Sequence, residues 1–390
     1  MVKDKKWSWD PKTLICNGAF TMAEWDHKNT ITLSRNEAYY DADNISIELI
    51  QCHLSDDAEE MYEGFTSGDW QYIEDVPLDK LEELKDDARL HNNGARTSTY
   101  LVFNANSAVI KGDEKQKESV RKALGILLDR ASITKDITAS GEIPASSYIA
   151  MGFSDYDGTE FYENCGINKD FTGYFNTGDN KGNKEKAMEV LKQYYTFDEE
   201  SEKFTDFPAL SYLYDKNDDI SEDIGKYLRD TLEEIGIDVD LESVKKDEYE
   251  ERVLSGDYTI ILDTIHSDED NVMNFLTPYS GGENIAGLGM NDHAKNKVYN
   301  MDLAPFGTDI MVKGGSWAET YDVILEAIKS SDTEKDKYSL MHMAEDQLMQ
   351  TGCIIPLYYS TERYMISDEL TNVYISPTGL KYFSYATLAK

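Results

Sequence analysis

In the middle of the chain, segments whose apolar residues have the spacing of a strand alternate with segments whose apolar residues have the spacing of a helix. Short stretches with strand spacing, "PALSYLY", "IDVDLESV" and "DYTIILDTI", are separated by two stretches with helical spacing, "DDISEDIGKYLRDTLEEIG" and "KDEYEERVLSG". In the first helix, Asp219 with Glu222 matches a capping box, and Gly236 suits the helix end. This strand–helix–strand–helix–strand order predicts a right-handed, mainly parallel, doubly wound sheet, and hence an α/β fold.

The flanking regions predict further elements. Before the doubly wound segment, strands are expected at "AFTMAEW", "TITLSRN", "NISIELIQCHL" and "STYLVFNAN", and helices at "DDAEEMYEGF" and "KESVRKALGILLDRASI". After it come a helix, "YSLMHMAEDQLMQTG", a strand, "CIIPLYYS", and a hairpin, "TNVYISPTGLKYFSYATL". Proline cannot donate to a strand ladder, so Pro356 predicts either an edge strand or a strand that crosses between lobes.

Composition and charge narrow the class of protein. A chain of 390 residues is long enough for two lobes with separate cores. The net charge of −37 leaves no basic surface for phosphates and therefore argues against nucleic-acid binding. Four cysteines without a CxxC pair exclude a disulfide scaffold and a zinc ribbon. The sequence shows neither an apolar stretch long enough for a membrane span nor a signal peptide at "MVKDKKWSWDP".

Candidate chemistry is concentrated in "TIILDTIHSDEDNVMNFL", where four acids and a histidine crowd together after an apolar strand. His266, Asp268 and Asp270 could hold a metal, act as an acid/base pair, receive a positive ligand, or cap the following helix. The HExxH, GxxxxGK[ST], GxSxG and strand-linked GxGxxG motifs are all absent. The sequence therefore predicts no cofactor, metal or catalytic residue, and an acid-pair hydrolase has no motif behind it.

Several segments together resemble the oligopeptide/dipeptide-binding family of substrate-binding proteins for ABC importers. The matching segments, in order, are "NGAFTMAEW…ITLSRNEAYYDADNISIELI", "EGFTSGDWQYI", "VFNANSAVIKGDEKQKESVRKALGILLDRASI", "IGKYLRDTLEEIGIDVDLESVKKDEYEERVLSGDYTIIL" and "AEDQLMQTGCIIPLYYSTERYMISDEL". We expect most of the matching charged residues to be structural rather than ligand contacts: Arg35, Asp41, Arg121, Asp129 and Arg130.

The resemblance implies a site and a mechanism. It implies capture of a small peptide in a cleft between lobes, with Asp268 meeting the ligand's α-ammonium group and backbone around Thr264 and His266 pairing with it. Ile265 stands where relatives carry an aromatic residue. Tyr358 is expected to line the cleft, with packing in the core as the alternative. Oligosaccharides, nickel and haem remain alternative ligands, as in other relatives.

The resemblance also implies the architecture and the setting. We expect a two-lobed, periplasmic-binding-protein-like fold, with residues 113–355 forming lobe II around the doubly wound sheet. Residues 1–112 and 356–390 would form lobe I, with a mixed and incomplete sheet, because the family's N-terminal part is missing. The expected partner is the membrane permease of an ABC importer, and the expected protein is a non-enzymatic monomer. The full-length form would be an extracytoplasmic, membrane-anchored lipoprotein in the periplasm or at the cell surface; a truncated remnant without binding activity is the alternative.

Overall fold

The computed structural model describes residues 10–105, 107–164, 173–282, 299–303, 311–375 and 380–389. Cys165 and His293 lie outside these residues. The chain forms two compact units, residues 1–93 with 362–390, and residues 94–361. The lobe boundaries expected near residues 112 and 355 stay a prediction, and each unit is described here by itself.

The first unit contains antiparallel strands and one longer helix. Strands β1 (Phe20–Asp26), β2 (Thr30–Arg35) and β3 (Leu49–His53) form a sheet in that order, which confirms the predicted hairpin and the third strand. Helix α1 (Ala58–Ser67) begins after Asp57, whose side chain accepts two backbone N–H bonds. It ends at Gly68 with φ +84°, a left-handed conformation that favours glycine.

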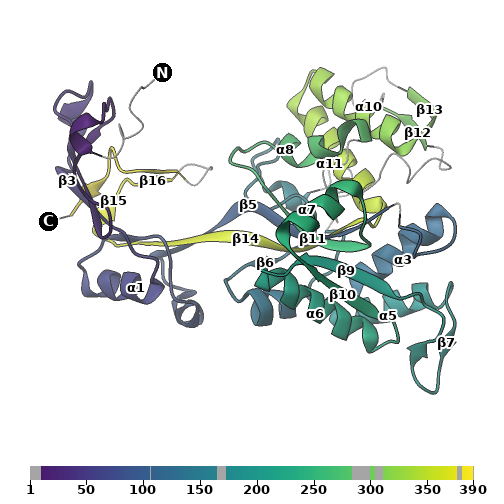
Figure 1. The fold of residues 1–390 in the computed structure, drawn as a ribbon. Helices are drawn as coiled ribbons and strands as arrows, with labels where there is room; N and C mark the ends of the chain where they lie inside the picture. The colour runs from purple at the N-terminus through teal and green to yellow at the C-terminus, as the bar shows by residue number, and fades with distance from the viewer. Residues whose placement is uncertain are drawn as a thin grey trace. The chain divides into compact units, whose positions relative to one another are not determined.

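The second unit is built on one mixed sheet, in the order β10-β9-β11-β5-β14. The five elements of the predicted doubly wound segment are all present: β9 (Leu210–Asp215), α6 (Asp219–Glu233), β10 (Val239–Val244), α7 (Lys246–Ser255) and β11 (Ile260–His266). Strands β10 and β11 both run parallel to β9 (Figure 1). The direction of winding therefore reverses between β9 and β11, the position where open α/β sheets bind ligands.

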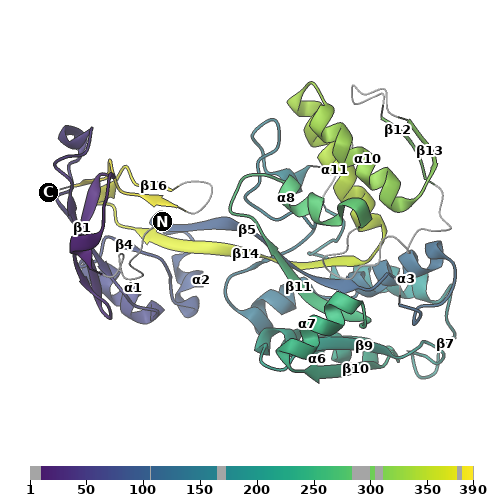
Figure 2. The same cartoon turned by 45° about the horizontal axis from the view of Figure 1, so that its top comes forward.

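Two long strands extend this sheet. Strand β5 (Leu90–Phe103) runs antiparallel to β11, and β14 (Ile354–Ile366) lies beside β5 in both views (Figures 1 and 2). β14 passes from the second unit to the first between Thr361 and Glu362, which agrees with a crossing strand that carries Pro356. β5 begins eight residues before the predicted "STYLVFNAN", because its first half is polar and lacks an apolar signal.

Helices cover the sheet and complete the core of the second unit. They are α3 (Glu114–Ile126), α5 (Asn180–Leu191), α10 (Trp317–Ser330) and α11 (Glu334–Gln350), the last two packed together (Figure 2). Large side chains buried in the core include Leu101, Tyr148, Tyr212, Phe275 and Trp317. No helix in the described part of the chain combines the length and apolarity needed to cross a bilayer.

Two predicted helix boundaries, one start and one end, were wrong in detail. The cap of α6 is Asp218, one residue before the expected Asp219, and its carboxylate accepts from the Ser221 N–H. The helix predicted over "KESVRKALGILLDRASI" ends at Ile126, because Asp129 starts a separate turn by accepting from two backbone N–H groups.

Candidate ligand-binding site

The candidate site lies at the carboxyl end of β11. Residues Ile260–His266 pair with Phe103–Thr97 of β5 along one edge. Along the other edge, the described ladder with β9 consists of the single pair Ile260–Tyr212. The carboxyl half of β11 therefore has an edge without a strand beside it among the described residues.

The pairing pattern shows which backbone groups face that edge. The Ser267 N–H donates to the Arg96 carbonyl of β5, so Ser267 and Arg96 form a hydrogen-bonded pair that continues the ladder between β11 and β5. Since hydrogen-bonded and non-hydrogen-bonded pairs alternate in an antiparallel ladder, Thr264 and His266 direct their N–H and C=O groups to the open edge. The Thr264 N–H donates there to Asp263 Oδ1 at 2.9 Å. The Tyr249 hydroxyl of α7 reaches the same edge and donates to the Leu262 carbonyl at 3.3 Å.

Side chains on one face of the sheet converge beside this edge. The Thr99 and Thr264 hydroxyl oxygens lie 2.9 Å apart, and Thr97 Oγ1 lies 2.8 Å from His266 Nδ1. Both contacts join non-hydrogen-bonded pairs, whose side chains approach more closely than those of bonded pairs. Thr97 and Thr99 were not predicted as site residues, although alternate threonines in "RTSTYL" are the signal of a polar strand face.

Asp268 follows directly after the strand and is almost fully exposed, with 91% of its side chain accessible. Its Oδ1 lies 2.9 Å from His266 Nε2, which brings together two residues singled out from the sequence. The alternative that these acids cap the following helix was wrong. Helix α8 (Met273–Leu276) begins too late for that role, and Asn271 rather than an acid accepts from the Met273 N–H.

Ile265 and Tyr358 lie differently from the other expected contacts. The Ile265 side chain faces the opposite side of the sheet and packs against the core. Tyr358 is buried in β14; burial raises the pKa of its phenol, and a hydrogen bond with Thr99 opposes the rise. Their roles as ligand contacts stay predictions, and Tyr358 touches the site through Thr99.

The loop after β11 is held in a defined shape. Asp270 accepts from both the backbone N–H and the hydroxyl of Ser154, at 2.9 and 2.8 Å. Ser267, buried at the start of the loop, accepts from the Glu269 N–H and from the Asn274 side chain. A loop with these internal bonds presents Asp268 without a large ordering cost on binding.

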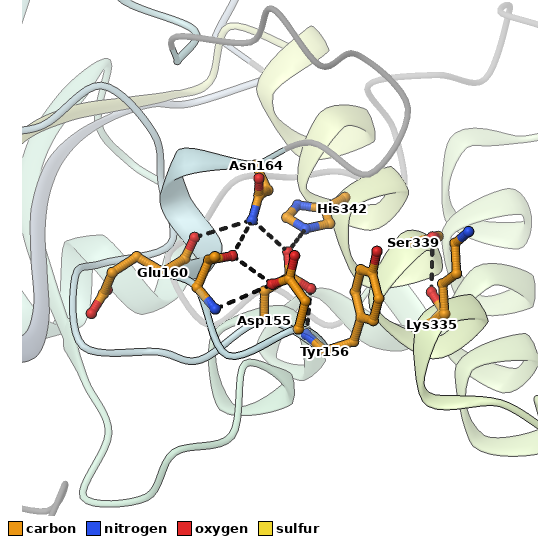
Figure 3. Close-up of polar contacts among 9 residues, drawn as sticks. Asp155, Tyr156, Glu160, Asn164, Lys335, Ser339 and His342 are labelled. Atoms are coloured by element: carbon orange, nitrogen blue, oxygen red, sulfur yellow. Dashed lines mark hydrogen bonds and ion pairs between the residues drawn. The ribbon is translucent and has the colours of Figure 1, made fainter.

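The segment that carries Ser154 is itself anchored to α11 (Figure 3). Asp155 is buried and contacts His342 Nε2 of α11 at 2.9 Å, and it also accepts from the Tyr156 N–H and the Asn164 amide. Phe161 stacks on the His342 ring with a centroid distance of 3.8 Å. These contacts fix the support of the site loop to a helix of the main core.

Comparisons with known proteins agree with this architecture. A family model described as "Bacterial extracellular solute-binding proteins, family 5 Middle" matches residues 1–287. The chain belongs to this family. The predicted family and the predicted fold class are thereby confirmed.

Individual relatives and structures extend the comparison. The Dipeptide-binding protein DppE of Bacillus subtilis is 24% identical over 378 residues, which are 96% of this chain and 60% of that protein. The unliganded open form of the periplasmic murein tripeptide-binding protein MppA superposes with a TM-score of 0.68 and 18% identity, covering 99% of this chain and 66% of that one. NikA from Brucella suis, in complex with Fe(III)-EDTA, gives 0.65 and 16%, covering 95% and 68%. The chain thus spans less than two thirds of DppE's length.

Proposed function

We propose that this family member is the substrate-binding component of an ABC importer and captures an extended peptide at the carboxyl end of β11. The observation that carries the proposal is the open edge at Thr264 and His266, with the exposed Asp268 carboxylate next in line. An extended peptide gains main-chain hydrogen bonds when it adds to such an edge, and this mode of binding does not read its side chains.

In this proposal, Asp268 orients the bound peptide. A peptide's free N-terminus is an ammonium group, and a carboxylate beside the added strand fixes the direction in which the peptide lies. The relatives named above bear on the ligand class, since one is named for dipeptides and another for a murein tripeptide. The position between two lobes that the resemblance implies stays a prediction.

The proposal extends to the setting of the whole protein. We place the whole protein outside the cytoplasm, anchored as a lipoprotein and delivering its ligand to membrane permease subunits. It acts by binding, without turnover of the ligand and without nucleic acid as a partner. The statement on nucleic acid rests on the net charge of −37, and the others rest on the family description and on relatives of which this chain spans only a part.

The first prediction concerns Asp268→Asn. This substitution removes a charge-assisted bond worth about 1.5–3 kcal/mol and should weaken a free-amine peptide roughly tenfold or more. The N-acetylated form of the same peptide should bind the variant and the wild type alike. Calorimetric titration of both peptides tests this, with Glu269→Gln as the control acid in the same loop. Equal losses for both peptides would show that Asp268 does not meet the ammonium group.

A non-peptide ligand is the second candidate, because the NikA complex with Fe(III)-EDTA has a similar fold. Within the described ranges, no group of three or more His, Cys, Asp or Glu residues is arranged to hold a metal ion. Mass spectrometry of ligands that co-purify with the protein separates the two candidates. Peptide masses support the first, and a metal chelate or sugar supports the second.

A further inference from the structure

Two side chains occupy consecutive backbone groups on the open edge of β11. The Tyr249 hydroxyl of α7, a helix that lies beside β11 in both views (Figures 1 and 2), donates to the Leu262 carbonyl at 3.3 Å. Burial raises the pKa of the Tyr249 phenol, so the hydroxyl keeps the proton that it donates. The next group along this edge is the Thr264 N–H, which donates to Asp263 Oδ1 at 2.9 Å. A ligand strand would have to displace both side chains to bond there.

Asp263 is held in place from inside the unit. Its Oδ2 accepts from the Tyr100 hydroxyl at 3.0 Å, and Tyr100 is the residue of β5 that pairs with Asp263 in the ladder. Tyr100 is 2% exposed. Turning Asp263 away from the edge would take this acceptor from a buried hydroxyl, which costs more than the bond itself contributes. The bond from Asp263 to the Thr264 N–H is therefore a fixed feature of the edge.

The rest of the edge is available to a ligand. Among the described residues, none pairs at this edge with the Thr264 carbonyl or with the N–H and carbonyl of His266. A peptide whose ammonium group meets Asp268 runs antiparallel to β11, because Asp268 follows the carboxyl end of the strand. The ligand residue opposite His266 can exchange both of its backbone bonds. The ligand residue two positions further on can donate its N–H to the Thr264 carbonyl, but its own carbonyl finds the Thr264 N–H already used.

We propose that Asp263 and Tyr249 are positioning residues that end the strand pairing of the ligand at the Thr264 carbonyl, so that β11 reads only the main chain of the peptide's amino-terminal segment. The inference rests on the proposed function, since it names the part of the peptide that the same site recognises. Residues beyond this segment gain no further main-chain bonds from β11. The ligand class is thus defined by a free amino terminus and a short extended segment, whatever the total length of the peptide.

The test compares two peptides with free termini, a hexapeptide of alternating alanine and serine and the alanyl-serine dipeptide, by calorimetric titration. The dipeptide is too short to reach the Thr264 N–H. The ratio of the two affinities therefore cancels any effect on the shared amino terminus. Asp263→Ala frees the Thr264 N–H and should raise the ratio of hexapeptide to dipeptide affinity roughly fivefold, the effect of one net hydrogen bond. Tyr249→Phe frees the Leu262 carbonyl and should raise the ratio by a similar factor.

Two control variants separate the loss of the bond from the loss of charge. Asp263→Asn keeps an oxygen that accepts from the Thr264 N–H, so the ratio should stay at the wild-type value. Asp240→Ala removes an exposed acid from β10 of the same sheet and should also leave the ratio unchanged. A ratio that does not rise in Asp263→Ala or in Tyr249→Phe overturns the role of that residue. An equal rise in Asp263→Ala and Asp263→Asn overturns the role of Asp263 as well, because charge would then be the cause.

A second measurement needs no ligand. Amide hydrogen exchange of Thr264, followed by NMR in the ligand-free protein, should be slow in the wild type and in Asp263→Asn and faster in Asp263→Ala. Equal rates in all three proteins overturn the inference. Peptide binding with an unchanged ratio in every variant leaves peptide capture standing without this limit. Absence of binding by both peptides in every variant contradicts the proposed function, and the inference falls with it.

Discussion

Glu345 is a carboxylic acid sealed inside the second unit. Only 1% of it is exposed, and its Oε1 accepts from the Tyr148 and Ile149 N–H groups at 2.9 and 2.8 Å. Burial raises the pKa of this carboxyl to about 7, while the two N–H donors lower it. Since Tyr148 and Ile149 precede the segment that supports the site loop, the charge state of Glu345 bears on the stability of that support.

Glu345→Gln should therefore change how stability depends on pH. The folded state raises the pKa from 4.5 to about 7, so it favours the protonated form. The stabilisation is complete below about pH 4.5 and is lost as pH rises to about 7, with a total near 3 kcal/mol. The free energy of unfolding of the variant, relative to wild type, should rise by up to that amount between pH 4.5 and pH 8.

Urea unfolding at both pH values measures this difference. Glu326→Gln on α10, an exposed acid beside Lys329, is the control and should show no such change. A Glu345→Gln variant whose stability follows the wild type at every pH would contradict the raised pKa.

The sequence predicted the charged structural residues well. Arg121 donates twice to the Thr351 carbonyl, and Arg130 donates to the Pro356, Gly125 and Leu128 carbonyls. Arg35 reaches the Ile45 carbonyl, and Asp41 accepts from the Tyr385 hydroxyl. Each of these residues lies within a segment that matches the family pattern. The His266–Asp268 contact was not predictable, because it depends on how the loop after β11 turns.

At the scale of elements, the open edge of β11 is the feature that matters for function. Thr264 and His266 face it with backbone groups, while the opposite edge is fully paired with β5. Buried strands are recognisable in a sequence as short apolar runs, so β9 and β11 were predictable. The sequence carries no signal for strand separation, so it did not predict that β11 separates from β9 after one residue pair.

Strand addition predicts an alternating response to N-methylation of the ligand. In an extended peptide, successive N–H groups point to opposite sides, so only every second one can bond to β11. Methylating those positions should weaken binding several-fold each, as expected for a net hydrogen bond of about 1 kcal/mol.

A set of isomeric peptides, each with one methyl group at a different position, provides its own control. Calorimetry should show weak and nearly unchanged binders in alternation along the chain. A uniform loss, or no loss at any position, would contradict pairing with the strand edge.

At the scale of the whole molecule, the charge of −37 gives a long-range preference for cationic ligands. This preference acts on the rate of arrival and weakens with salt, and it adds nothing specific at the site. The division into two compact units, with β5 and β14 each spanning both, is the feature that the hydrophobic pattern conveyed least. The periodicity of apolar residues indicates local helices and strands only. It did not reveal the full length of β5, because the first half of that strand is polar.

The central claim is that an extended peptide is captured along β11 with its ammonium group at Asp268. Hydrogen–deuterium exchange with and without a saturating peptide pool tests it most directly. Capture along β11 predicts slower exchange at His266, whose N–H faces the open edge, and in the loop from residue 267 to 270, which carries Asp268. Ligand binding that protects other regions and leaves these residues exchanging as before would contradict it.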